Sequence, residues 1–314
     1  MNQSKSLLFL FTGQGAQYPN MLSELMQKEP VFKKSMNQCF KLFQSYHIDL
    51  NHKYHSSEVN QTRYTQPALF SVEYALSQLW QSWGISPNLM IGHSIGEIVA
   101  CTIADVFSLE DACNLVSIRA RLMDSIQVDG GMLAILGEFN RFKHMIPETI
   151  DIAGYNAQKQ IVVSGLKKDL SSFQAQLKSE NVRSIPLKVS HPFHSRYMSP
   201  MIDEFTHHIS SMSFAKPKIT IYSNLTSKPC EAFDADYFAR HITHPVHFYQ
   251  SIQQVLNVQD PVMLECGPGP ILTSLVKKDH PHCKIIPSCD KLDSSNLFIS
   301  EAKSQILEEI SNVY

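Results

Sequence analysis

The sequence predicts an α/β fold in which an α/β-hydrolase-like large subdomain, built on a parallel sheet, has an inserted ferredoxin-like small subdomain. Three observations support this prediction. Strand and helix patterns alternate along the whole chain. A serine flanked by glycines lies on a tight turn between an apolar strand and a helix, as in a nucleophile elbow. Between residues 130 and 190 the elements become shorter and follow the ferredoxin-like order β-α-β-β-α-β.

The first part of the chain predicts two buried strands and two long helices. The apolar runs Leu7–Phe11 and Leu89–Ile91 have the length and composition of buried strands. A helix is predicted to start at Thr65–Pro67, because proline suits the first helical position and apolar residues then repeat at helical spacing up to Trp83. Another helix is predicted from Ser108, a serine followed by acidic residues as at a helix N-cap.

The remaining elements divide the chain into two subdomains. The ferredoxin-like subdomain is assigned to residues 130–193, and the α/β-hydrolase-like catalytic subdomain to residues 1–129 and 194–314. The small subdomain is predicted to contain strands at 132–136, 150–154, 161–164 and 183–187 and helices at 140–148 and 170–180. The main sheet is then predicted to continue with strands at 219–223, 262–265 and 284–287, followed by a surface helix at 298–312.

Composition agrees with a cytoplasmic enzyme that has neither nucleic acid nor membrane as a partner. With 314 residues, of which 43% are hydrophobic, the chain can bury a large core. Its formal net charge is -2 and it has no basic run that would attract phosphates or anionic lipids. The segment Met1–Phe11 resembles the start of a signal peptide, but its apolar run is too short and Thr12–Gly15 ends it without a cleavage site. No stretch approaches the ~18 apolar residues of a membrane span.

Cysteine and histidine usage predicts reduced thiols and no metal site. The seven cysteines are scattered, odd in number and without a C-x-x-C pair, which fits cytoplasmic thiols better than disulfides or zinc. The pair His191-x-x-His194 lacks an acidic residue or a cysteine pair at ligand spacing. We therefore expect no bound metal.

The motif that points most directly to chemistry is Gly92-His93-Ser94-Ile95-Gly96. Its glycines allow a sharp turn without a Cβ clash, so the Ser94 hydroxyl stands at the end of the strand and near the helix N-terminus. There it can attack a carbonyl carbon, and backbone amides can bind the resulting oxyanion. Such a serine needs a base, and His194 lies in a polar, proline-containing loop, where catalytic groups are common. The elbow points His93 away from the hydroxyl, so we expect His93 to form a hydrogen bond near the nucleophile and not to be the base.

Eight motifs, most of them spread in order along the chain, together form a specific pattern. They are Gly13-Gln14-Gly15-Ala16-Gln17, Tyr64-Thr65-Gln66-Pro67-Ala68, the elbow followed by Glu97, Arg119-Ala120-Arg121-Leu122-Met123, Phe193-His194-Ser195, Asn156 before Val162-Val163-Ser164-Gly165, Arg240-His241 before Pro245-Val246, and Glu265-Cys266-Gly267-Pro268-Gly269. Together they cover nearly the whole chain. The chain resembles the malonyl-CoA:acyl-carrier-protein acyltransferase family, which serves fatty-acid synthesis and polyketide synthases.

The resemblance implies a two-step acyl transfer. Ser94 would attack the thioester of malonyl-CoA, with His194 accepting its proton, and the phosphopantetheine thiol of an acyl carrier protein would then take the group from the acyl-serine. The main-chain amides of Gln14 and Ile95 are implied as the oxyanion hole. The group that orients His194, commonly a main-chain carbonyl in the family, is implied near His241. Acyl-CoA and phosphopantetheine enter as substrates, and no bound cofactor is implied.

The resemblance also implies which residues contact the substrate. Arg119 lies beside apolar neighbours on its helix, where a guanidinium needs an anion, and in the family this arginine binds the free carboxylate of malonate. The alternative is a structural ion pair with an internal Asp or Glu. Phe193 resembles the bulky residue that disfavours an α-methyl group in malonyl-preferring members, and its alternative role is ordinary loop packing. The implied substrate-binding residues are Arg119, Phe193, Gln66, Asn156 and His93.

Three functions remain open. The first is malonyl transfer to carrier proteins, either in fatty-acid synthesis or by a free-standing polyketide-type enzyme, which the YTQPALF and RARLM segments favour. The second is hydrolysis, in which water takes the acyl group as in proofreading members that clear carrier proteins. The third is a non-catalytic docking module, against which the intact Ser94, His194 and Arg119 argue. We expect transfer, because a buried cation and a bulky Phe193 suit selection of malonate and not broad hydrolysis.

Overall fold

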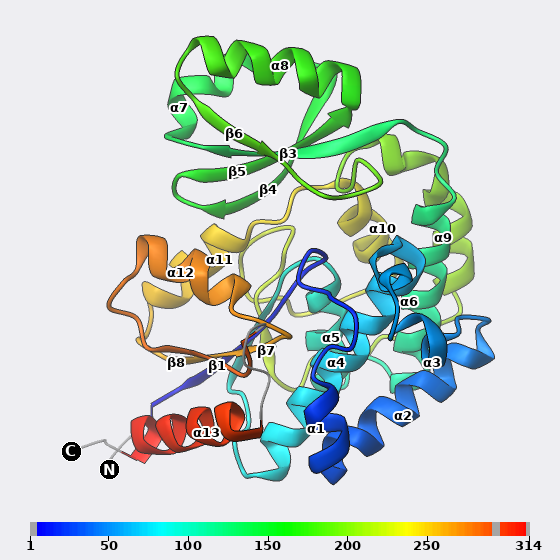
Figure 1. The fold of residues 1–314 in the computed structure, drawn as a ribbon, viewed down its shortest axis with the longest axis vertical. Coiled ribbons are helices and arrows are strands. Elements are labelled where there is room, and N and C mark those ends of the chain that lie inside the picture. Colours follow the sequence, from blue (N-terminus) through cyan, green and yellow to red (C-terminus); the bar gives the residue numbers. More distant parts are fainter. Residues whose placement is uncertain (1–4, 291–295, 312–314) are drawn as a thin grey trace.

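The computed structural model describes residues 5–290 and 296–311. Residues 1–4 of the signal-peptide-like start and residue 312 of the predicted C-terminal helix lie outside the described residues. Within the described part, one parallel and one antiparallel sheet each pack against their own helices (Figure 1). The α/β prediction is confirmed.

The parallel sheet has five strands in the order β7-β2-β1-β8-β9, and every neighbouring pair is parallel. Its strands are β1 (Leu7–Phe11), β2 (Leu89–Gly92), β7 (Thr220–Ile221), β8 (Val262–Cys266) and β9 (Ile285–Pro287). All five agree with predicted strands. Strand β7 is shorter than the predicted range 219–223, and Tyr222, which follows it, forms an isolated bridge to Pro229.

The helices around this sheet follow the predicted alternation. They are α1 (Ser23–Lys28), α2 (Pro30–Ser45), α3 (Leu50–Lys53), α4 (Thr62–Ser82), α5 (Ile95–Ile103), α6 (Leu109–Asp124), α9 (Ile202–Ile209), α10 (Ala235–Thr243), α11 (Phe248–Leu256), α12 (Ile271–Asp279) and α13 (Asn296–Ser311). Short 3₁₀ turns lie at Ser57–Asn60 and Arg196–Met201. Ser108 caps α6 as predicted, since its side chain accepts from the Asp111 amide.

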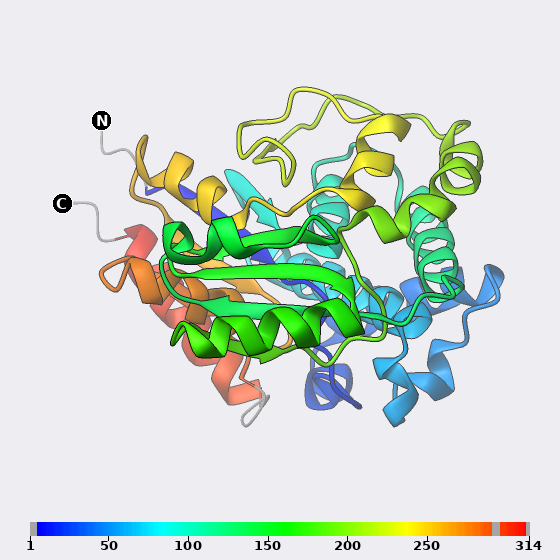
Figure 2. The same cartoon turned by 90° about the horizontal axis from the view of Figure 1, so that it is seen from above.

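Strand β1 is buried on both faces, as a central parallel strand requires. Leu8 and Leu10 pack into one core with α11 and α12, whereas Phe9 and Phe11 pack into the larger core with α4, α5 and α6. The sheet is therefore covered by helices on both sides (Figures 1 and 2). This arrangement brings the loops after β1, β2 and β7 to one edge of the sheet, where ligands bind in open parallel sheets.

The antiparallel sheet has four strands in the order β4-β5-β3-β6, and every neighbouring pair is antiparallel. It lies beyond the carboxyl edge of the parallel sheet, at the top of Figure 1. With two helices it follows the predicted β-α-β-β-α-β order, and its core contains Phe142 and Phe173. Its elements are β3 (Gly130–Leu136), α7 (Phe139–Phe142), β4 (Ile150–Ala157), β5 (Gln160–Leu166), α8 (Lys167–Ser179) and β6 (Arg183–Pro186).

The predicted start of α4 is wrong by one turn. The helix begins at Thr62 and not at Thr65, which places Pro67 inside it. The Thr65 amide already bonds to the carbonyl of Gln61 at 2.8 Å, so the first turn is closed before the proline. Pro67 therefore removes one helical hydrogen bond, and the buried apolar face of the helix stabilises it in spite of that loss.

The helix predicted at 140–148 is also wrong in extent. Only α7 and a 3₁₀ turn at Lys143–Met145 form there. Pro147 disfavours a helical conformation at the residue before it, and Ile146 is extended with a ψ of 115°.

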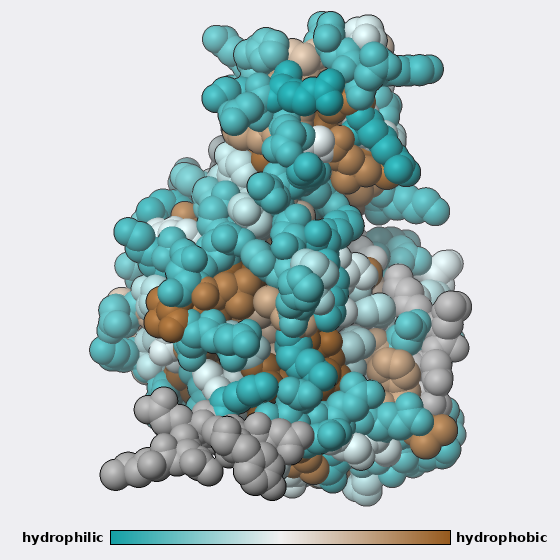
Figure 3. Space-filling model, turned by 90° about the vertical axis from the view of Figure 1, so that its left-hand side faces the viewer, coloured by the Kyte–Doolittle hydropathy of each residue, from teal (hydrophilic) through white to brown (hydrophobic). Residues whose placement is uncertain are grey.

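The described residues include no helix that is long and apolar enough to cross a membrane. The face of the molecule in Figure 3 is mainly hydrophilic, with hydrophobic side chains in separate small patches. All seven cysteines are free thiols.

Helix α5 lies against the end of β1 at Gly96, which is the last residue of the elbow motif. A Cβ at Gly96 would lie 2.4 Å from the carbonyl oxygen of Phe11 and 2.7 Å from that of Thr12. Only glycine fits at this distance, because both neighbours are backbone atoms of the central strand and the loop that follows it.

We predict that Gly96→Ala lowers the melting temperature, although alanine is a better helix former than glycine by about 1 kcal/mol. The added methyl group would force α5 away from β1. Thermal unfolding followed by circular dichroism measures the change. The control is Gly131→Ala, whose Cβ would come no closer than 3.7 Å to another residue. If Gly96→Ala melts at or above the wild-type temperature, the close approach is not the reason for glycine.

Candidate active site

The elbow holds Ser94 in a conformation that few residues adopt. Ser94 joins β2 to α5 with a φ of 53° and a ψ of -114°. Such a strained backbone costs on the order of 1–3 kcal/mol and persists only where the surroundings fix it. A Cβ at Gly92 would lie 2.0 Å from the Glu97 amide nitrogen, so the elbow needs glycine at both ends.

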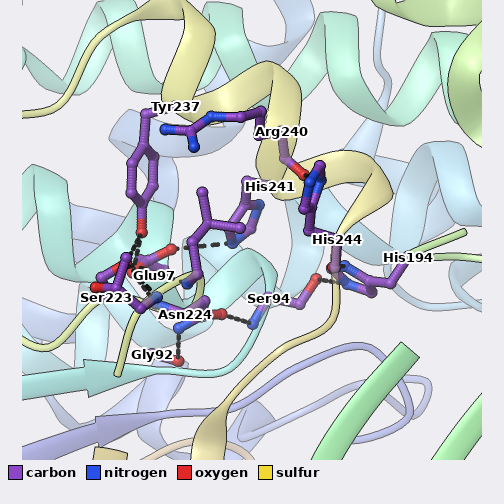
Figure 4. Close-up of polar contacts among 12 residues, drawn as sticks. Gly92, Ser94, Glu97, His194, Ser223, Asn224, Tyr237, Arg240, His241 and His244 are labelled. Carbon is purple, nitrogen blue, oxygen red and sulfur yellow. Dashed lines mark hydrogen bonds and ion pairs between the residues drawn. The ribbon is translucent and has the colours of Figure 1, made fainter. Parts of the chain in front are cut away.

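The structure brings Ser94 and His194 together. The Ser94 hydroxyl oxygen lies 2.7 Å from His194 Nε2, and His194 Nδ1 lies 3.0 Å from the carbonyl oxygen of His244 (Figure 4). A carbonyl can only accept, so Nδ1 holds the ring proton and Nε2 has a free lone pair for the Ser94 proton. His194 itself has a φ of 55°, a second strained position in the same site.

The environment keeps His194 neutral. Burial lowers the pKa of His194 well below its usual range, and the nearby His241, Arg119 and His93 lower it further. The histidine can therefore accept a proton from Ser94 at neutral pH and below it.

The orienting role expected near His241 belongs to another residue. The carbonyl that bonds to His194 is that of His244, at the start of the segment after α10. The His241 side chain points to Glu97, with 3.0 Å between its Nε2 and Glu97 Oε2 (Figure 4). The assignment to His241 is therefore corrected, because the acceptor at His194 Nδ1 is the His244 carbonyl and not a group of His241.

Glu97 is a fully buried acid, and the only basic side chain paired with it among the described residues is the neutral His241. Burial raises the pKa of Glu97 to about 8, against the opposing effect of hydrogen bonds from the Asn224 amide and the Tyr237 hydroxyl. Burial lowers the pKa of His241 well below its usual range. At neutral pH Glu97 is therefore mainly protonated and His241 is neutral, so the pair carries little charge.

Arg119 is buried without an acidic partner. It is 3% exposed, its Nη2 donates to the Ser94 hydroxyl oxygen at 3.1 Å, and its Nη1 donates to Gln66 Oε1. No Asp or Glu within the described ranges pairs with it, and its Nε has no hydrogen-bond partner there. Burial lowers the pKa of Arg119 to about 9, so it remains charged at neutral pH. The alternative of a structural ion pair is therefore not supported. Arg121, in contrast, is exposed and lies 3.5 Å from Glu204.

A cavity of about 110 Å³ lies in front of Ser94. Its walls include the apolar side chains of Met123, Met132, Leu187 and Val189. All the site residues taken from the sequence line it except His241, namely Gln14, Gln66, His93, Ser94, Ile95, Arg119, Asn156, Phe193 and His194.

Gln14 and Ile95, whose amides are the predicted oxyanion donors, both line this cavity. Ile95 is the first residue of α5, so its N–H has no acceptor within the helix. Gln14 follows Gly13 in the loop after β1. A Cβ at Gly13 would lie 2.7 Å from His93 Nδ1, so glycine lets this loop approach the elbow.

His93 and Asn156 connect the two sheets at the cavity. His93 Nε2 lies 2.8 Å from Asn156 Oδ1, which extends from β4 of the antiparallel sheet. Burial lowers the pKa of His93, so its ring is neutral. His93 therefore makes a hydrogen bond beside the nucleophile, as predicted, and it also lines the cavity.

Sequence reasoning missed Asn224, the His244 carbonyl and Tyr237. Asn224 Oδ1 accepts from the Ser94 amide at 2.8 Å, and Tyr237 donates to Glu97 at 2.8 Å. One signal for Asn224 existed, since it directly follows the predicted strand at 219–223. This signal does not by itself place Asn224 beside Ser94, because only the order of strands in the sheet shows that the strand before Asn224 lies next to β2. Across the described ranges, no group of three or more His, Cys, Asp or Glu side chains is arranged to hold a metal ion.

Comparison with known proteins places this geometry among acyltransferases. A sequence model described as "Acyl transferase domain" matches residues 8–308. Mycoketide-CoA synthase of Mycobacterium tuberculosis is 33% identical over 280 residues, which cover 87% of this chain and 7% of that protein. The chain thus spans a small part of the length of the curated relatives it matches.

Solved structures agree in fold over almost the whole chain. The acyltransferase domain from the second module of the salinomycin polyketide synthase has a TM-score of 0.92 and 31% identity, covering 99% of this chain and 75% of that one. The malonyl-CoA:acyl carrier protein transacylase (FabD) from Xanthomonas oryzae has a TM-score of 0.85 and 28% identity, covering 96% and 99%.

We predict that Glu97→Gln removes part of the pH dependence of the free energy of unfolding. The raised pKa of Glu97 means that its contribution to stability is full below the ordinary value of 4.5 and is lost as the pH rises to about 8. Glutamine stays neutral throughout. The free energy of unfolding of the variant, relative to wild type, should therefore increase steadily across this range.

Urea unfolding at about pH 5 and about pH 8 measures, at each pH, the difference in free energy of unfolding between the variant and wild type. Other buried acids, such as Glu73 and Glu265, are present in both proteins and cancel. A difference that is constant between the two pH values would show that Glu97 has an ordinary pKa in the folded state.

Proposed function

The chain belongs to the acyl transferase family, and from that premise we propose that it transfers a malonyl group from malonyl-CoA to the phosphopantetheine thiol of an acyl carrier protein, on the same or on another chain. The observation that supports malonyl is the charged guanidinium of Arg119, which is buried beside the nucleophile and pairs with no acid in the described part of the chain. The polyketide synthases among the relatives support polyketide biosynthesis as the pathway. The proposed place of action is the cytoplasm, where the seven free cysteines remain reduced.

In the proposed first step, Ser94 attacks the thioester carbonyl carbon while His194 Nε2 takes its proton. The His244 carbonyl holds the ring in the tautomer that this needs and stabilises the imidazolium that forms. The amides of Gln14 and Ile95 bind the oxyanion. The tetrahedral intermediate then expels the coenzyme A thiolate, which takes the proton from His194, and a malonyl-serine ester remains.

The second step reverses this chemistry with another thiol. The phosphopantetheine thiol gives its proton to His194 and attacks the ester, and Ser94 leaves and recovers its proton. The proposed cycle uses side chains and backbone of this chain, and coenzyme A and phosphopantetheine take part only as carriers of the acyl group.

Selection of the acyl group is proposed to depend on Arg119 and Phe193. The malonyl carboxylate would replace the Ser94 hydroxyl as a partner of the guanidinium, and Gln66 would hold the guanidinium plane from its other side. Phe193, which is 6% exposed and lines the cavity, would leave no room for an α-methyl group.

We predict that Ser94→Ala abolishes covalent labelling by radiolabelled malonyl-CoA. Wild type should retain label after denaturation, because the ester bond survives it. His194→Ala should be acylated ~10²–10⁴-fold more slowly, the loss that is typical for a general base. Label on Ser94→Ala at another residue would contradict the proposed nucleophile.

The acceptor is tested with a phosphopantetheinylated carrier protein and intact mass spectrometry. Transfer predicts a carrier that gains malonyl faster than in an enzyme-free control. A carrier that instead loses acetyl or longer acyl groups, with no malonyl gain, would assign the chain to hydrolysis.

We predict that Arg119→Ala loses malonyl transfer selectively. A charge-assisted hydrogen bond contributes ~1.5–3 kcal/mol, so the malonyl-to-acetyl ratio of kcat/KM should fall roughly 10- to 150-fold, while acetyl transfer survives. Arg121→Ala is the matched control, because this exposed arginine lies on the same helix and does not line the cavity. Equal losses for both acyl groups in Arg119→Ala would contradict carboxylate recognition.

A further inference from the structure

The strained turn at Ser94 is held by one side chain that does not line the cavity. Asn224 follows β7 and is 1% exposed. Its Oδ1 accepts from the Ser94 amide at 2.8 Å, and its Nδ2 donates to the Gly92 carbonyl oxygen at 2.6 Å (Figure 4). One amide group therefore bridges the two sides of the elbow.

Asn224 is itself fixed through its backbone. Its N–H donates to Glu97 Oε1 at 2.8 Å, and its carbonyl accepts from the His247 amide at 2.9 Å. Glu97 lies in the first turn of α5, the helix that follows Ser94, and it also accepts from the Tyr237 hydroxyl. The elbow, Asn224 and Glu97 thus form a closed ring of hydrogen bonds around the turn.

This bridge has a consequence for the oxyanion hole. The Ser94 amide is occupied by Asn224, so it does not point a free N–H at the reacting carbonyl. The proposed donors at Gln14 and Ile95 then receive the oxyanion alone. The direction of the Ile95 N–H depends on the same turn, because Ile95 is the next residue of the chain.

We propose that Asn224 is a positioning residue that sets the Ser94 hydroxyl and the Ile95 amide for acylation, and that this requires a group that both accepts from Ser94 and donates to Gly92. The inference rests on the proposed acylation of Ser94. Asn224 does not line the cavity, so its loss should reduce the acylation rate constant and leave substrate affinity unchanged.

Asn224→Asp tests the requirement with almost no change in shape. An ionised aspartate can accept from Ser94 but opposes the Gly92 carbonyl, whereas a protonated aspartate donates to that carbonyl as the amide does. Burial raises the pKa of a carboxyl group, so acid should restore the variant. The titratable groups that face position 224 are Glu97 from α5 and, through Glu97, Tyr237 and His241 from α10.

Two further titratable groups, the neutral His194 and the charged Arg119, contact Ser94 on its other side. Wild type contains all of these groups. The ratio of the variant rate to the wild-type rate at each pH therefore isolates the effect of the side chain at position 224.

The experiment follows single-turnover acylation by malonyl-CoA and, in parallel, the reaction of Ser94 with a fluorophosphonate, in which the serine oxygen bonds to phosphorus and fluoride leaves. Asn224→Asp should be at least ~10-fold slower than wild type at about pH 8, and the difference should shrink to within ~3-fold at about pH 5.5. Asn224→Ser, which cannot span both groups, should be slow at both pH values. Asn88→Asp is the control for the substitution itself, because the exposed Asn88 accepts from the Leu7 amide at the end of β2 opposite the elbow and should behave as wild type.

A deficit of Asn224→Asp that is the same at both pH values, or no deficit, overturns the proposal. If this variant does not fold at pH 8, Asn224→Ser decides: a lowered rate constant with unchanged KM supports the proposal, and an unchanged rate constant overturns it. Failure of malonyl-CoA to label wild type would instead reject the proposed function, and the fluorophosphonate rates would still report the role of Asn224.

Discussion

The site depends on one buried charge that the described protein does not neutralise. Arg119 is held beside Ser94 by neutral partners only, a hydroxyl and an amide oxygen. A buried cation without an anion is unfavourable, so this arrangement is stable only because the surrounding core fixes it, and it favours a ligand that brings a carboxylate. The same charge contributes to the low pKa of His194, which keeps the base neutral. Burial is the largest cause of that low pKa, and the Arg119 charge adds to it. In the proposed mechanism this charge therefore acts both on the acyl group and on the base.

The position of this charge is useful only if the nucleophile and the base are held around it. The segment after α10 links them. The His244 carbonyl orients His194, Val246 exchanges backbone hydrogen bonds with Ala153 and Tyr155 of β4, and the His247 amide bonds to Asn224. A single stretch of backbone thus joins the base, the antiparallel sheet and the elbow, and the cavity lies between them.

The sequence predicted the parts of this site that depend on local chemistry. The elbow could be recognised because glycine spacing and flanking strand and helix patterns determine it, and Arg119 because a guanidinium on an apolar face is unusual. The His244 carbonyl could not be predicted, because every residue has a carbonyl and only the path of the backbone selects one. Asn224 required the neighbour relation of β7 and β2. The predictions for the helix at 140–148 and for the start of α4 were wrong because of two prolines. Pro147 ends the helical conformation before it, as its local geometry requires, whereas Pro67 lies inside α4, where tertiary packing outweighs the lost hydrogen bond.

Recognition of a carboxylate by Arg119 is tested most directly by measuring how tightly acyl-CoA thioesters bind when they cannot react. Ser94→Ala removes the nucleophile, and calorimetry then gives the Kd of malonyl-CoA and of acetyl-CoA, which differ at the free carboxylate. The account predicts that malonyl-CoA binds roughly 10- to 150-fold more tightly, the equivalent of one charge-assisted hydrogen bond, and that the advantage disappears when Arg119 is also replaced by alanine. Equal affinity for the two thioesters would contradict it.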